Sequence, residues 1–166
     1  MAFETYDRWS VRRRFLLGAL LVAAVSLLQL IQLGFGGFSG SFWPLAYLWA
    51  ICGWSGLGPR VTSAVAIFAL GVWLDILTGA PLGTWPLIGL ASHGLTLLSD
   101  NFLVTLDLGP LGACALTACF MLVMMMLWGL LRDHQWHILS MLPATIGAVA
   151  LYPLFAPLFE MAEDEA

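Results

Sequence analysis

The chain has 166 residues, of which 61% are hydrophobic and only 10% are charged, and its mean hydropathy is +0.93. Soluble domains are about half apolar and about a quarter charged, so this composition excludes an ordinary soluble fold. Six basic and ten acidic side chains are also too few to cover a soluble protein of this size. The sequence therefore predicts an all-α integral membrane protein with room for about six spans of about 20 residues each.

The charges are concentrated at the two ends of the chain. Four of the six basic residues precede the first apolar run, namely Arg8, Arg12, Arg13 and Arg14. Four acids lie in the last seven residues, namely Glu160, Glu163, Asp164 and Glu165. Four arginines are too few for the basic face that a nucleic acid requires, so we expect no nucleic-acid partner. They are typical of a signal that fixes membrane topology.

In chain order, the sequence predicts three parts. Residues 1–14 form a polar cytoplasmic segment in which Phe3, Tyr6 and Trp9 alternate with charge, and we expect a short helix there at the level of the lipid headgroups. Residues 15–159 form the transmembrane domain, and residues 160–166 form an acidic cytoplasmic tail. Within the domain, continuous apolar runs without the alternation of barrel strands predict helices at 15–33, 42–57, 61–78, 84–99, 111–131 and 137–159.

An even number of spans puts both termini on one side of the membrane. With the N-terminus in the cytoplasm, five arginines lie inside and only Arg132 lies outside, which the positive-inside rule favours. The second span, at 42–57, is short, and Trp43 and Trp54 near its ends are expected to anchor it at the two interfaces. We therefore expect an inner-membrane protein with both termini in the cytoplasm.

The most informative segment runs from Gly71 to Gly83. Asp75 interrupts an apolar run about one turn before Gly79, where a carboxylate is costly unless it has a partner or lies near the interface. Gly71, Asp75 and Gly79 share one helical face, and small residues on such a face allow close helix packing. Gly79, Pro81 and Gly83 predict a sharp reversal with glycines at positive φ. Asp75 either contacts a partner or accepts hydrogen bonds from free amides at the start of the next helix.

Other polar residues in the apolar runs are scattered. His93 is expected to lie about 7 Å along the axis from Asp75, too far for an ion pair, and to bond Ser92, Ser99 or a carbonyl. Gln29 and Gln32, with Ser26, form a stripe on the first span that either ties helices together or lines a polar pocket.

The sequence contains no pattern that indicates an enzyme. It has no P-loop, no nucleophile elbow and no zinc-protease motif, so we expect a non-catalytic protein without a cofactor. His134 and His137 lie three apart beside Asp133, which is too weak a signal for a metal site. The three cysteines, Cys52, Cys114 and Cys119, are interpreted as small reduced hydrophobic residues.

At Asp75-Ile-Leu-Thr-Gly79-Ala-Pro81-Leu-Gly83 the chain resembles the bacterial rod shape-determining MreD family. The mark of that family is an acidic residue near the end of one span, followed by G-x-P-x-G and a further apolar span. The length, the short connections and the arginine-led N-terminus also fit. The basic inner connection is reduced here to Arg60, where many relatives carry more charge.

The resemblance implies a non-catalytic inner-membrane component of the cell-elongation machinery. It implies binding to the periplasmic scaffold MreC and, directly or through MreC, links to RodA, a class B penicillin-binding protein and MreB filaments. It also implies a fold similar to the substrate-binding subunits of energy-coupling-factor vitamin transporters. Ala19-x-x-x-Ala23 resembles the small-residue contact of those subunits with their coupling partner, so a vitamin-type transport subunit is the alternative function.

Overall fold

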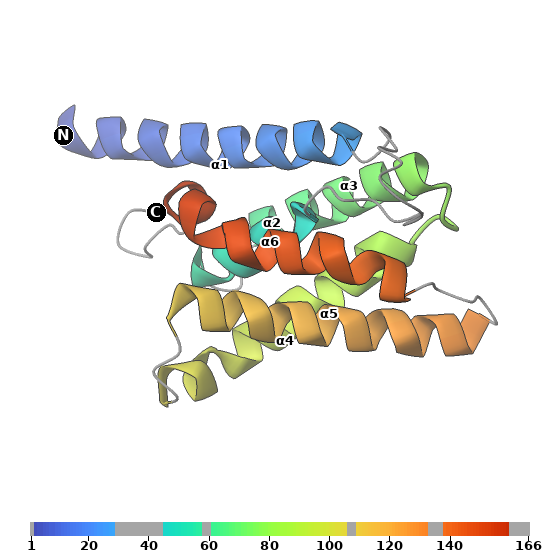
Figure 1. Cartoon of the computed structure of the whole chain (residues 1–166). Coiled ribbons are helices and arrows are strands. Elements are labelled where there is room, and N and C mark those ends of the chain that lie inside the picture. The colour runs from blue at the N-terminus through green and yellow to red at the C-terminus, as the bar shows by residue number, and fades with distance from the viewer. Residues whose placement is uncertain (1, 29–44, 58–60, 106–108, 133–137, 160–166) are drawn as a thin grey trace.

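A computed structural model describes residues 2–28, 45–57, 61–105, 109–132 and 138–159 of the chain (Figure 1). These residues contain no strand, so the all-α prediction is confirmed for this part of the chain. The helices are α1 (Ala2–Leu28), α2 (Tyr47–Gly53), the 3₁₀ helix η1 (Trp54–Leu57), α3 (Val61–Thr78), α4 (Thr84–Thr105), α5 (Pro110–Arg132) and α6 (Ile138–Phe159).

Three of the described helices are long and apolar enough to cross a membrane, over Val61–Thr78, Leu111–Leu131 and Met141–Phe159. Their outward faces carry large apolar side chains such as Phe68, Leu130 and Leu154, which are exposed. In water such a surface would be unfavourable, whereas lipid tails solvate it well. The helices thus have the character of a membrane protein.

Helix α1 continues through the boundary that the sequence analysis placed after residue 14. It is one helix of 27 residues, or about 40 Å, so the expected headgroup-level helix is a continuation of the first apolar run. Its N-terminal part projects beyond the rest of the bundle (Figure 1). Helix α1 begins, and α6 ends, at the same end of the bundle (Figure 1).

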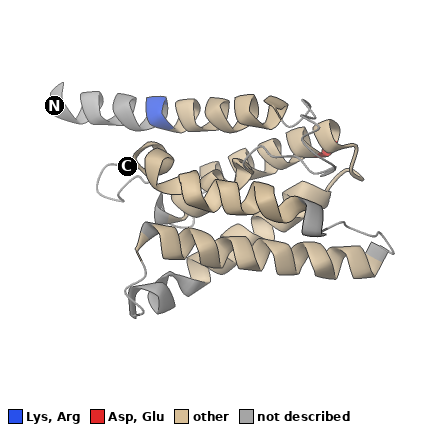
Figure 2. Cartoon of the chain, viewed as in Figure 1, with Lys and Arg blue, Asp and Glu red and all other residues tan. Residues whose placement is uncertain are grey.

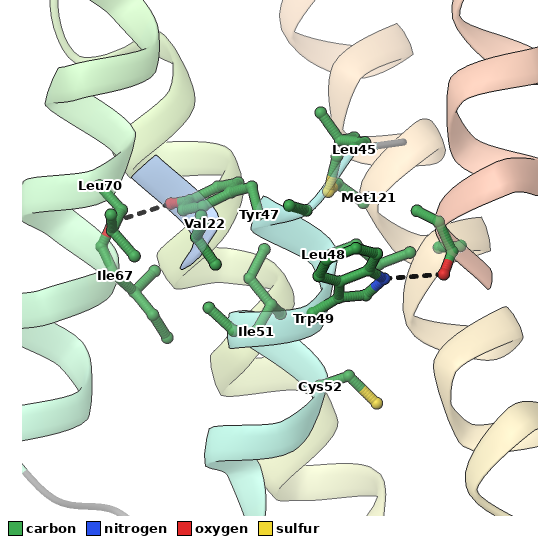
Figure 3. Close-up of a cluster of buried hydrophobic side chains, with 14 of the residues drawn as sticks. Val22, Leu45, Tyr47, Leu48, Trp49, Ile51, Cys52, Ile67, Leu70 and Met121 are labelled. Carbon is green, nitrogen blue, oxygen red and sulfur yellow. Dashed lines mark hydrogen bonds between the residues drawn. The ribbon is translucent and has the colours of Figure 1, made fainter. Parts of the chain in front are cut away.

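Helix α2 lies at the centre of the bundle and differs from the predicted span at 42–57. It has only seven residues, about 10 Å, and every one of them is buried. A helix of that length does not cross a hydrocarbon core of about 30 Å. The 3₁₀ helix η1 follows α2 directly and adds four residues. Tyr47 points toward α3 and Trp49 toward α6, so both side chains fill the interior of the bundle (Figure 3).

Hydrogen bonds hold α2 in this central position. The Leu45 backbone amide donates to the Ala144 carbonyl at 3.1 Å, and Trp49 Nε1 donates to the Ala148 carbonyl at 2.8 Å. On the opposite side, the Tyr47 hydroxyl donates to the Ile67 carbonyl at 2.9 Å. One of these donors is the backbone amide that precedes α2, and the other two are side-chain groups. All three are satisfied by carbonyls of α3 and α6 instead of water, which a buried polar group requires.

The structure corrects the role predicted for Trp54. This side chain is 0% exposed, so it is not an interfacial anchor. Its ring stacks on Phe15 of α1 with centroids 4.4 Å apart and lies 6.1 Å from the ring of Phe159 in α6. Aromatic packing therefore joins η1 to the first and last helices. Trp43, the other predicted anchor, lies outside the described residues.

Candidate functional site

The α3–α4 hairpin contains the motif that the sequence analysis singled out. Asp75, near the end of α3, is 1% exposed, and both of its carboxylate oxygens face the start of α4. Oδ2 accepts the Gly83 backbone amide at 2.6 Å, and Oδ1 accepts the Trp85 backbone amide at 2.9 Å. One side chain thus joins the two helices through two charge-assisted hydrogen bonds.

These contacts follow from the physics of a helix start. The first amides of α4 have no partner within the helix, and its positive end attracts negative charge. Asp75 satisfies two such donors from the preceding helix, as an N-cap side chain does within its own helix. These are the hydrogen bonds that the capping interpretation predicts. Because both oxygens of Asp75 point inward, any effect of this residue on a partner acts through the shape of the hairpin.

The turn between the helices has the backbone that its glycines predict. Gly79 has φ of 66° and Gly83 has φ of 95°, a region that other residues rarely adopt. Pro81 and Leu82 form the tip between them, and Leu82 is 78% exposed. The hairpin therefore presents a fixed, apolar tip at one end of the bundle.

A second set of hydrogen bonds stabilises the base of this hairpin. Thr78 Oγ1 donates to the Leu74 carbonyl at 2.7 Å and accepts Trp85 Nε1 at 3.1 Å. Thr84 Oγ1 donates to the Pro81 carbonyl at 2.7 Å and accepts Trp128 Nε1 of α5 at 3.3 Å. None of these four residues was among the predicted site residues. Thr78 and Thr84 lie beside the turn glycines, so a local sequence pattern could have indicated them. Trp128 lies 44 residues from Thr84, so no local pattern indicates its contact.

Gly71 takes part in the close packing that its small size predicted. A Cβ atom there would lie 2.5 Å from the nitrogen and 2.7 Å from the Cα of Pro86. Such distances leave no space for a side chain, so α3 and α4 are in backbone contact just below Asp75. The close approach brings the carboxylate within reach of the α4 amides.

The remaining polar residues are not gathered at this hairpin. His93, 4% exposed, has Nδ1 3.2 Å from the Ile51 carbonyl and Nε2 3.4 Å from Ser63 Oγ. A carbonyl only accepts, so Nδ1 carries the proton and Nε2 accepts from Ser63. The expected carbonyl partner is present, and the serine that bonds His93 is Ser63; Ser92 Oγ has no hydrogen-bond partner among the described residues, and the side chain of Ser99 lies outside them. His93 thus links α4 to α2 and α3.

The other predicted positions form no second site among the residues that the structure describes. Ser26 Oγ donates to the Val22 carbonyl within α1, and Gln29 and Gln32 lie outside the described residues. Ala19 and Ala23 are partly buried and pack against the protein's own core, so their contacts are at least partly internal. The sequence pattern alone did not reveal which side of α1 faces the bundle.

The described part of the chain contains no cluster of side chains that could hold a metal ion. No group of three or more His, Cys, Asp or Glu side chains is found there, and His134 and His137 lie outside it. Cys52, Cys114 and Cys119 form no disulfide with one another. Figure 2 shows the described basic residues (blue) on α1 and the described acidic residue (red) where α3 meets α4, at opposite ends of the bundle. The hairpin is therefore the candidate functional site.

Comparison with known proteins adds no identification: no family model, curated protein or solved structure matches this chain.

Proposed function

We propose that this protein is a non-catalytic inner-membrane component of the bacterial rod complex, with the α3–α4 hairpin as its contact for the scaffold MreC. Through MreC it helps to organise RodA, a class B penicillin-binding protein and MreB filaments in peptidoglycan synthesis and cell shape. The proposal rests on the resemblance of the Asp75–Gly83 segment to the MreD family.

The observation that best supports it is the way Asp75 fixes the hairpin. Two hydrogen bonds from one buried carboxylate, at 2.6 and 2.9 Å, hold a tip whose Leu82 side chain is 78% exposed. A preorganised apolar tip loses little conformational entropy on binding, which favours a protein contact. A catalytic role would instead require reactive groups that face a substrate, and both oxygens of Asp75 are turned into the protein.

Charge supports an orientation that places this tip outside the cytoplasm. Arg13 and Arg14 lie on α1 at the end of the bundle opposite the hairpin (Figure 2). Arginines accumulate on the cytoplasmic side, so the hairpin is assigned to the periplasmic side, with both termini in the cytoplasm. This is the side on which a periplasmic scaffold is available.

The proposed fold is a bundle that crosses the membrane six times, with the buried α2 as part of the second pass. It is similar to the fold of the substrate-binding subunits of energy-coupling-factor transporters. A transport subunit would need a cavity lined by several polar groups near the midplane. Helix α2 fills the centre of the described bundle with Tyr47, Trp49 and Ile51. The scaffold function is therefore preferred to vitamin-type transport.

The test is capture of the tagged protein from its native membranes in mild detergent, with partners identified by mass spectrometry. Leu82→Ala is compared with Leu98→Ala, because Leu98 on α4 is exposed to the same degree, 76% against 78%. We expect the wild type and Leu98→Ala to recover MreC and the elongation synthases, and Leu82→Ala to recover at least several-fold less. Equal recovery by both variants would remove the hairpin from the interface.

Asp75→Ala extends the same test. The variant should insert into the membrane at normal levels and lose partner recovery and cell-shape function. Recovery of paired ATPases with a transmembrane coupling subunit, by any of these proteins, would contradict the scaffold function and favour transport.

A further inference from the structure

A seam of regularly spaced residues joins α3 to α4. It consists of residues four apart on each helix, namely Ser63, Ile67, Gly71 and Asp75 on α3 and Trp85, Gly89 and His93 on α4. Residues four apart lie on one face of a helix, so each set forms one side of the seam. Hydrogen bonds cross the seam near both ends, from the Trp85 amide to Asp75 and between Ser63 and His93.

Tyr47 of α2 reaches the middle of this seam. Its side chain is fully buried, and its hydroxyl donates to the Ile67 carbonyl of α3 at 2.9 Å and to the Trp85 carbonyl of α4 at 3.3 Å. Figure 3 shows the Tyr47 side chain pointing from α2 toward Ile67. Because a tyrosine hydroxyl has one proton, the two carbonyls share it in a three-centre hydrogen bond. One side chain of α2 therefore bonds both helices of the hairpin.

A glycine makes the contact with α4 possible. In an α-helix the amide that bonds a carbonyl belongs to the residue four positions later, which for Trp85 is Gly89. A Cβ on Gly89 would overlap the Tyr47 hydroxyl, and it would lie 2.6 Å from the Cζ atom of the ring. The lack of a side chain at Gly89 thus opens the Trp85 carbonyl to Tyr47.

Trp85 connects this contact to the cap of the hairpin. Its carbonyl accepts the hydrogen bond from Tyr47, and its amide donates to Asp75 Oδ1 at 2.9 Å. The Trp85 and Tyr47 rings also meet edge to face, with centroids 6.3 Å apart. Asp75 in turn accepts the Gly83 amide at the hairpin tip at 2.6 Å. A displacement of Tyr47 is therefore transmitted through Trp85 to the tip.

We propose that Tyr47 is a positioning residue for the hairpin: its hydroxyl couples the buried helix α2 to the α3–α4 tip, so the position of α2 determines how firmly the tip is held. Coupling between two sites is reciprocal, so a protein that binds the ordered tip also stabilises the contact of α2 with the seam. This consequence for a partner rests on the function proposed above, whereas the coupling itself requires no partner.

The coupling is tested by hydrogen exchange at the Trp85 amide, measured by NMR in lipid nanodiscs. Tyr47→Phe keeps the ring and removes the hydroxyl, so we expect exchange at this amide to become at least several-fold faster. Trp49→Phe is the matched control, because it removes the hydrogen bond from the other side of α2 to the Ala148 carbonyl. It should leave exchange at the Trp85 amide unchanged. An equal acceleration in both variants would refute the coupling, because it would mean that any loosening of α2 loosens the whole bundle.

Gly89→Ala provides a second test that retains the tyrosine. Its methyl group displaces the Tyr47 hydroxyl from the Trp85 carbonyl, so exchange at the Trp85 amide should again become faster. Gly94→Ala is the control, because Gly94 lies on the same helix and a Cβ there would meet nothing within 4 Å. Unchanged exchange in both Tyr47→Phe and Gly89→Ala would refute the coupling.

Capture of partners by the Tyr47→Phe protein separates this inference from the proposed function. Reduced recovery of partners together with faster exchange at the Trp85 amide would support both. Faster exchange with full recovery would support the coupling and contradict the role of the hairpin as the partner contact. Reduced recovery with unchanged exchange would refute the coupling, because Tyr47 would then affect the partner by another route.

Discussion

Asp75 accepts the backbone amide of Trp85, ten residues further along the chain, at 2.9 Å. The contact joins the end of α3 to the first turn of α4, and the Gly83 amide bonds the other carboxylate oxygen at 2.6 Å. A buried acid in an apolar helix is thus explained by two donors that would otherwise be unsatisfied at a helix start.

Asp75→Ala should destabilise the protein through this hairpin. The substitution leaves the amide of the buried Trp85 without an acceptor, at a cost of about 1–3 kcal/mol, whereas the amide of the exposed Gly83 is able to bond water instead. We expect a clear fall in the thermal midpoint of the detergent-solubilised protein. Ile76→Ala is the control, because Ile76 is the next residue and is 64% exposed, so its truncation should change the midpoint little. A variant as stable as the control would show that water replaces the carboxylate.

Gly79→Ala tests the backbone of the turn separately from its packing. A Cβ on Gly79 would meet nothing within 4 Å, so only the positive φ of 66° opposes the change. The left-handed conformation costs about 1–2 kcal/mol for a residue with a side chain. Asn tolerates that conformation better, so Gly79→Asn should recover part of the loss in the same unfolding measurement.

Gly94→Ala is the matched control for the glycine substitutions. This residue also has open space around a Cβ, but it lies within α4 and not at positive φ. Alanine stabilises a helix by about 0.5–1 kcal/mol relative to glycine, so Gly94→Ala should leave stability unchanged or raise it. Destabilisation by this variant would show that something outside the chain packs against Gly94.

Gly71→Ala should be more harmful than Gly79→Ala for a different reason. The new methyl group would lie 2.5 Å from the Pro86 nitrogen, which belongs to the backbone of α4 and does not move aside cheaply. We expect a loss of at least about 1–3 kcal/mol, as for overpacked cores, together with weaker hydrogen bonds to Asp75. Hydrogen exchange at the Gly83 and Trp85 amides should rise in this variant. Unchanged hydrogen exchange at these amides would show that the close packing of α3 and α4 at Gly71 does not affect the hydrogen bonds to Asp75.

The sequence predicted the hairpin well because its determinants are local. Asp75, Gly79 and Gly83 lie within nine residues, and a carboxylate one turn before a glycine turn has few other donors to meet. The position of α2 was not predictable in the same way. Its hydrogen bond from Trp49 to Ala148 joins residues 99 apart in the sequence. An apolar run also has the same composition whether lipid or protein covers it, so composition does not show that α2 is buried. Trp54 was misplaced for the same reason.

His93 should stabilise the junction of α2, α3 and α4 through two distinct hydrogen bonds. Nδ1 donates to the Ile51 carbonyl at 3.2 Å, and Nε2 accepts from Ser63 at 3.4 Å. The Asn side-chain amide lies near the position of Nδ1, so His93→Asn retains a donor for Ile51, whereas His93→Phe keeps the ring size and removes both partners. We expect His93→Phe to lose about 1–3 kcal/mol and His93→Asn to lose less, because a carbonyl at the end of α2 is costly to leave buried and unpaired. Ser63→Ala leaves the bond to Ile51 intact and removes the longer contact with His93, so it should cost the junction less than His93→Phe. The order of the thermal midpoints tests this assignment. A larger loss for His93→Asn than for His93→Phe would mean that packing of the ring, and not hydrogen bonding, is what His93 contributes to this junction.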